Sequence, residues 1–174
     1  DPSDGRFARD ADGNLSGMVA ENARQVFSSV GRRDQLAATE RRDRAREGMA
    51  HISRLLTATG LTSVHDAGAS RDKLVAYQDA FRAGELRHRA YLMVRGPFDD
   101  LRNAGISTGF GNEWLRIGGV KYMADGSASE RTMRMSTAFE GKPDDFGIST
   151  MSQQEIHEVV EEAHRHNWQI GVHA

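Results

Sequence analysis

One lysine in the middle of an apolar run is the residue on which chemistry would centre. Lys121 lies within Leu115-Arg-Ile-Gly-Gly-Val-Lys-Tyr-Met-Ala-Asp-Gly-Ser127, a pattern that predicts a buried strand with polar groups at its C-terminal end. Burying a lysine costs free energy unless a partner or loss of the proton compensates. Three interpretations stay open: an ion pair with a carboxylate, a neutral amine that could form a Schiff base, or a carbamate made with CO2.

Other ionisable residues also come at or near the ends of predicted strands. His173 follows the apolar residues Ile170-Gly-Val172, His65 and Asp66 end the run that begins at Leu61, and Asp125 follows the lysine strand. A histidine at a strand end is either a metal ligand or a side chain satisfied within the core. Spacing alone leaves both possibilities open for His173.

The remaining histidines are poorer candidates for a metal site. His164 and His166 are two residues apart on a predicted helix, so their rings point to different sides and cannot share one ion. His157 is two helical turns before His164, and His88 precedes a strand. We interpret all four as surface residues.

The elements that must position these residues alternate between strand and helix. Asp12-Gly13 predicts the turn of an N-terminal hairpin. The acidic residues there do not have the spacing of a calcium-binding loop, so we prefer the turn. A short helix should follow from about Ala20 to Val30. The later helices begin at signals such as Ser70 and the capping box Ser152-Gln-Gln-Glu155. The predicted helices are 32–59, 71–83, 99–104 and 153–166, the strands are 61–66, 86–94, 115–124 and 169–173, and 127–150 is irregular.

Repeated strand–helix units of this length predict an α/β fold with parallel strands and covering helices. Either half of a (β/α)8 barrel or a doubly wound sheet would satisfy the pattern, and in both the chemistry collects at the carboxyl ends of the strands. We expect residues 1–30 to form an excursion with the hairpin and short helix, and residues 31–174 to supply the β/α units.

Composition excludes several function classes. The chain has 23 basic and 25 acidic residues, so neither nucleic acid nor an anionic membrane is an expected partner. It has no cysteine, which excludes disulfides and thiolate metal sites and agrees with a cytoplasmic location. There is no signal-peptide pattern, and no apolar run approaches membrane-spanning length.

The segments just described resemble the amidohydrolase superfamily, most closely its metal-dependent branch that includes N-substituted formamide deformylases. The resemblance is strongest in two segments, Gly119-Val-Lys-Tyr-Met-Ala-Asp-Gly-Ser127 and Gln169-Ile-Gly-Val-His-Ala174. Two further segments agree with it, Gly60-Leu-Thr-Ser-Val-His-Asp-Ala67 and Asp1-Pro-Ser-Asp-Gly5. Asp4 and Leu15-Ser16 depart from the branch, which prefers Gly and Pro-Thr there. The resemblance implies a partial TIM (β/α)8 barrel, roughly strands two to five with their helices.

The resemblance also implies site roles. Lys121 corresponds to the family's fourth-strand lysine, which is carboxylated in many relatives and bridges metals, and His173 to the fifth-strand metal ligand. His65, Asp66 and Asp125 would be pocket residues or support the ligands. The implied cofactor is one or two divalent metal ions, with zinc expected. The implied activity is hydrolysis of a small-molecule amide or formamide, at a carbon–nitrogen bond other than a peptide bond, by a metal-activated hydroxide.

The chain ends in a predicted strand, so we expect a fragment of a longer protein that would be inactive alone and could form a homo-oligomer. The alternative function is a non-catalytic α/β module in which Lys121 and the 127–150 segment bind a small anionic ligand.

Overall fold

The structure is a computed structural model that describes residues 2, 4–31, 35–95 and 98–174. The chain divides into two compact units, one made of Asp1–Arg33, Met123–Val160 and Val172–Ala174, and the other of Asp34–Tyr122 and Glu161–Gly171. In chain order the elements are β1 (Gly5–Arg9), β2 (Leu15–Glu21), the 3-10 helix η1 (Asn22–Phe27), α1 (Ala38–Ala58), β3 (Ser63–Ala69), α2 (Arg71–Arg82), β4 (Arg89–Arg95), α3 (Asp99–Asn103), β5 (Phe110–Gly111), β6 (Leu115–Met123), α4 (Gln153–Arg165) and β7 (Gln169–His173).

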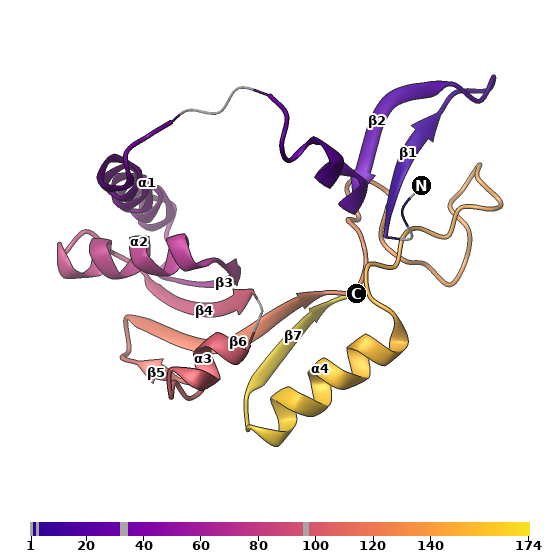
Figure 1. Cartoon of the computed structure of the whole chain (residues 1–174). Helices are drawn as coiled ribbons and strands as arrows, with labels where there is room; N and C mark the ends of the chain where they lie inside the picture. Colours follow the sequence, from indigo (N-terminus) through magenta and orange to yellow (C-terminus); the bar gives the residue numbers. More distant parts are fainter. Residues whose placement is uncertain (1, 3, 32–34, 96–97) are drawn as a thin grey trace. The chain divides into compact units, whose positions relative to one another are not determined.

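The second unit is built on a mostly parallel sheet. β3 pairs with β4 and β4 with β6, both parallel, while the two-residue β5 is antiparallel to β6. β7 also pairs with β6, and the two arrows run in the same direction in Figure 1. The predicted α/β class with parallel strands is therefore confirmed. Closure into a barrel stays a prediction.

Two apolar clusters cover one face of this sheet. The first joins α2 to β3 and β4, and Figure 1 shows α1 lying beside α2. The second places Trp168 and Ala163 of the α4–β7 segment against Val94 and Val120. Alternation along β4, where Ala90, Leu92 and Val94 are buried, is what a strand with one covered face should show.

Helix α1 differs from its prediction in both start and buried face. Residues 35–37 are not helical, and the predicted start at Arg32 lies outside the described residues. Ile52 and Leu55 are about half exposed, whereas Ala50 and Ser53 are buried. The sequence predicts a buried apolar stripe along this helix, and that prediction is wrong for Ile52 and Leu55; its members are Leu36, Met49, Ile52, Leu55 and Leu56. Small side chains on the face toward α2 allow the two helices to approach closely, and hydrogen bonds satisfy the Ser53 hydroxyl.

His88 also differs from its prediction, because its side chain is fully buried rather than on the surface. Its Nδ1 lies 2.9 Å from the Ser53 hydroxyl, which also accepts the backbone N–H of Arg87 at 2.7 Å. Burial lowers the pKa of this histidine. His157, His164 and His166 are exposed, as predicted.

The hairpin of the first unit is confirmed. Gly5 pairs with Glu21 and Arg9 with Leu15, and the Asp10 carboxylate accepts the backbone N–H groups of Asp12 and Asn14 in the turn. The short helix predicted from about Ala20 to Val30 is present as the 3-10 helix η1. None of the described helices has the length and hydropathy needed to cross a membrane.

The long segment 127–150 contains no helix or strand, as predicted, apart from an isolated bridge between Ser149 and Asp125. The capping box that follows is also confirmed. Ser152 N donates to the Glu155 carboxylate at 2.7 Å, and Glu155 N donates to the Ser152 hydroxyl at 3.2 Å.

Candidate functional site

A buried carboxylate and a partly exposed imidazole are in contact within the first unit. Asp125 Oδ1 lies 2.5 Å from His173 Nδ1, and the carboxylate is 3% exposed against 39% for the imidazole. An ionised carboxylate only accepts hydrogen bonds, so Nδ1 carries the hydrogen in this contact. The other ring nitrogen, Nε2, is then the one with a lone pair for a ligand when the ring is neutral.

Backbone contacts explain why Asp125 is fixed there. Its second oxygen, Oδ2, accepts the backbone N–H of Arg134 at 2.8 Å. On one side, Ala124 N donates to His173 O at 2.9 Å, and on the other, Thr150 N donates to Ala124 O at 2.9 Å. The residue before Asp125 is thus tied to both the β7 end and the end of the 127–150 segment.

Lys121 belongs to the second unit and is 9% exposed. Its Nζ donates to the backbone carbonyl of Tyr122 at 3.0 Å. Its chain passes over Gly171, where an added Cβ would lie 3.7 Å from Lys121 Cδ and 2.4 Å from Met93 Cε. The absence of a side chain at Gly171 makes room for both neighbours. An amine in this buried position fits any of the three predicted interpretations.

His65 and Asp66 project to opposite faces of the sheet, as neighbours in a strand do. The His65 ring stacks at a tilt on Tyr91, with 4.9 Å between centroids. Asp66 faces α2, where Lys73 Nζ lies 3.2 Å from its carboxylate and the Tyr77 hydroxyl donates to it at 3.4 Å. Burial and, after it, the Asp66 charge raise the pKa of Tyr77. Asp66 therefore braces a covering helix.

Of the five residues predicted for the site, the structure brings Asp125 and His173 into contact. Tyr91 and Met93 are two residues apart in β4, so their side chains lie on the same face of the sheet. His65 stacks on Tyr91, and Met93 and Lys121 both lie close to Gly171, so His65 and Lys121 share that face. Sequence reasoning missed Arg134, which acts through its backbone, and Tyr91, whose hydroxyl donates to Gly118 O at 2.8 Å. A backbone donor leaves no signal in residue type, but the alternation of Arg89–Arg95 could have identified Tyr91.

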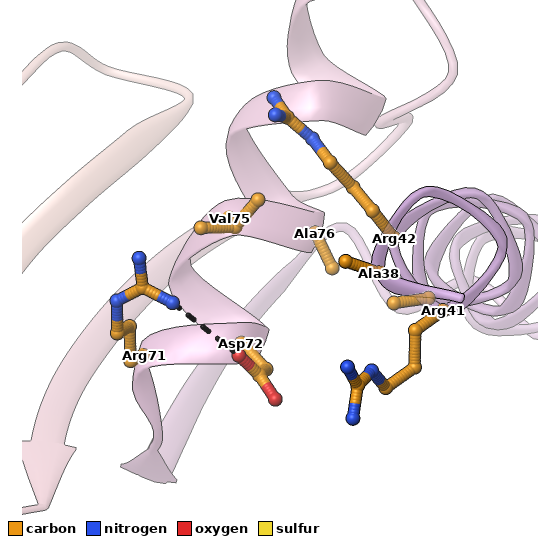
Figure 2. A pocket seen from close by; sticks show the side chains of 8 residues that line it. Ala38, Arg41, Arg42, Arg71, Asp72, Val75 and Ala76 are labelled. Carbon is orange, nitrogen blue, oxygen red and sulfur yellow. Dashed lines mark ion pairs between the residues drawn. The ribbon is translucent and has the colours of Figure 1, made fainter. Parts of the chain in front are cut away.

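A cavity of 430 Å³ lies between α1 and α2, and all of its lining side chains come from these two helices (Figure 2). Two of its three arginines pair with acids. Arg42 Nε lies 2.6 Å from Asp79, and Arg71 lies 3.9 Å from Asp72. Because no strand-end residue lines it, this cavity is separate from the predicted site.

The donor chemistry of Asp125 and His173 suits a divalent metal, because metal-binding histidines usually donate their other N–H to a carboxylate. Lys121 would become an oxygen ligand only as a carbamate. Within the described parts of the chain, no three His, Cys, Asp or Glu side chains are grouped closely enough to hold an ion. Hydrolytic metal sites normally use three or more protein ligands. Asp125 and His173 can therefore supply part of a metal site.

Comparison with known proteins agrees with this chemistry. A family model described as the amidohydrolase family matches residues 1–174. The chain belongs to the amidohydrolase family. That confirms the family inferred from the lysine and histidine segments, while the formamide deformylase branch stays a prediction. The search of curated proteins gave no match.

Two solved structures share the fold of this amidohydrolase chain. They are uncharacterized metal-dependent hydrolases from Pyrococcus horikoshii OT3 and Pyrococcus furiosus, with TM-scores of 0.70 and 0.69. Each is 23% identical in sequence, and each match covers 95% of this chain. The chain spans only 33% and 34% of those two proteins, about a third of their length.

Proposed function

We propose that this chain is part of a metal-dependent hydrolase that cleaves carbon–nitrogen bonds other than peptide bonds in small-molecule amides, with N-substituted formamides as the first class to test. The observation that carries the proposal is the buried Asp125 carboxylate against His173 Nδ1 at 2.5 Å. Family membership supports hydrolysis at a carbon–nitrogen bond. The substrate class rests on the resemblance of the Lys121 segment.

Asp125 and Arg134 prepare the histidine. The carboxylate holds the hydrogen on Nδ1, which fixes the tautomer that leaves Nε2 as a ligand atom. The Arg134 backbone N–H holds the other carboxylate oxygen, so the carboxylate cannot turn away from the ring. A bound divalent cation would polarise the scissile carbonyl and make water more acidic.

The family resemblance gives Lys121 a ligand role as well, in the form of a carbamate. Desolvation favours the neutral amine, and the neutral amine is the form that adds to CO2. The addition forms an N–C bond and releases a proton, so the product is an anionic group with two oxygens that would serve as a ligand for one or two divalent ions, zinc being the first to test. The proposed full site also needs ligands from outside this chain.

The experiment uses the full-length protein. Wild type, stripped with a chelator and then given zinc, should lose and regain hydrolysis of N-substituted formamides, with no cleavage of peptides. His173→Ala should remain inactive after zinc is returned, while Asp66→Asn, which alters the carboxylate that contacts Lys73 and Tyr77 of α2, should behave as wild type. Turnover that survives both the chelator and His173→Ala would refute the proposal and favour a non-catalytic or metal-independent role for the site.

A further inference from the structure

We propose that Glu21, in the N-terminal hairpin, is a positioning residue for His173 that acts through Thr132 and Asp125. All four residues belong to the first unit. The inference rests on the proposed function only in taking the positioned imidazole as a metal ligand. Its structural part, the control of the His173 orientation, can be tested without metal.

The chain of contacts begins at a buried threonine. The Thr132 hydroxyl donates to Glu21 Oε1 at 2.5 Å and accepts the backbone N–H of Ser127 at 2.9 Å. Thr132 is 5% exposed, and its carbonyl accepts the backbone N–H of Ile148 at 2.8 Å. A buried threonine with these contacts has little freedom to shift.

Thr132 is coupled to Asp125 by two hydrogen bonds, which with the chain between them form a small closed ring of contacts. Ser127, which donates to Thr132, is two residues after Asp125, and Arg134, whose N–H holds Asp125 Oδ2, is two residues after Thr132. Gly126, between Asp125 and Ser127, packs so tightly against Thr132 that an added Cβ would lie 2.4 Å from Thr132 Oγ1. Displacing Thr132 therefore displaces the donor that holds the Asp125 carboxylate against His173.

Glu21 has a strained backbone conformation, which the close packing at the base of the hairpin maintains. Its φ of 50° with ψ of −133° is unfavourable for a residue with a side chain, and Arg131, next to Thr132, has a φ of 54°. Gly5 pairs with Glu21, and its position is so close to Ala23 that a Cβ would lie 2.2 Å from Ala23 N. Such conformations persist where surrounding contacts determine them, and they cluster at functional sites.

A second tie between the hairpin and the same segment offers a matched control. Arg6 makes two hydrogen bonds to the Asp145 carboxylate, at 2.7 and 2.9 Å. Asp145 is not a member of the ring that contains Asp125. Losing this ion pair loosens the hairpin and leaves the Glu21–Thr132 contact in place.

The test compares four variants of the full-length protein: Glu21→Gly, Thr132→Val, Thr132→Ser and Arg6→Gln. Glycine suits the positive φ at position 21, so Glu21→Gly removes the carboxylate while relieving backbone strain and should keep a thermal midpoint close to wild type. Serine retains the hydroxyl of Thr132, and valine removes it at similar volume. The first readout is the exchange rate of the His173 Nδ1 proton by NMR in metal-free protein, assigned by its loss in His173→Gln. The second readout is zinc affinity by competition with a chelator.

We expect Glu21→Gly and Thr132→Val to speed the proton exchange about tenfold or more and to weaken zinc binding about tenfold, within the range for loss of a partner of a metal ligand. Thr132→Ser and Arg6→Gln should stay within about twofold of wild type. Wild-type exchange in Glu21→Gly, or an equal acceleration in Arg6→Gln, would overturn the inference. If the wild type binds no zinc, the proposed function fails, and the proton-exchange comparison still decides the positioning role.

Discussion

Asp125 and His173 are 48 residues apart in sequence, yet their side chains meet with 2.5 Å between Oδ1 and Nδ1. The contact joins the residue that follows β6 by two positions to the last residue of β7. The contact fixes the tautomer of His173 and leaves its other ring nitrogen, Nε2, pointing away from Asp125.

Replacing Asp125 should weaken metal binding without removing a ligand. In Asp125→Asn the partner of Nδ1 loses its charge, and the amide can present N–H where Arg134 N needs an acceptor. We expect zinc affinity of the full-length protein to fall about 10- to 100-fold. Chelator competition measures this, with Asp66→Asn as the control that should keep wild-type affinity. Unchanged affinity in Asp125→Asn would show that this carboxylate does not support a ligand.

Lys121 should carry a carbamate in the full-length protein. Protein prepared with 13C-labelled bicarbonate should show a carbamate carbon in its NMR spectrum, and Lys121→Arg should lack it, because a guanidinium stays protonated and does not add to CO2. Lys73→Arg, at an exposed lysine paired with Asp66, is the control and should retain the signal. A signal that persists in Lys121→Arg would place the modification elsewhere.

His88 should make the fold sensitive to acid. Its Nε2 has no hydrogen-bond partner in the described structure, and burial lowers its pKa from the ordinary 6.5. Above that value the histidine is neutral in both states and adds nothing to the pH dependence. Below it the unfolded chain binds a proton that the folded chain resists, so stability falls as pH falls, by at most about 1.4 kcal/mol per pH unit.

The measurement for His88 is the free energy of unfolding between pH 7.5 and 5, compared with His88→Asn. Asparagine can keep a hydrogen bond to Ser53 and cannot be protonated in this range, so the variant should be less stable overall but less dependent on pH. An identical pH slope in the two proteins would assign the acid sensitivity to other groups.

Gly118 should tolerate no side chain. An added Cβ would lie 1.7 Å from Cζ of Tyr91, whose hydroxyl is fixed by the Gly118 carbonyl. We expect Gly118→Ala to destabilise the fold by about 1–3 kcal/mol, as overpacking does. Gly48 in α1 has open space around it, so Gly48→Ala should instead stabilise by about 0.5–1 kcal/mol. Thermal unfolding separates the two, and equal effects would contradict the close packing at Tyr91.

The sequence predicted the parts of the fold that follow from local pattern. The hairpin turn at Asp12-Gly13, the capping box at Ser152, the irregular 127–150 segment and the strand around Lys121 all follow from residue order. The buried state of His88 and the exposure of Ile52 were missed. Both depend on how α1 meets α2 and the start of β4, and residue order does not encode that packing directly.

The residue types of the proposed site can be read from the sequence, whereas the contacts that support them cannot. His173 and Asp125 were identified because they end strands, but their contact required the pairing of β7 beside β6. Glu21 lies more than a hundred positions before Thr132, and neither residue type is unusual where it stands. Their connection is a tertiary contact, which residue type and order do not indicate.

The metal content of the purified full-length protein tests the central claim most directly. Wild type should contain one or two divalent ions per chain by elemental analysis, His173→Ala should contain fewer, and Arg42→Gln, at the outer α1–α2 cavity, should match wild type. A wild-type protein without metal after purification in zinc, or full occupancy in His173→Ala, would contradict the assignment of His173 as a metal ligand.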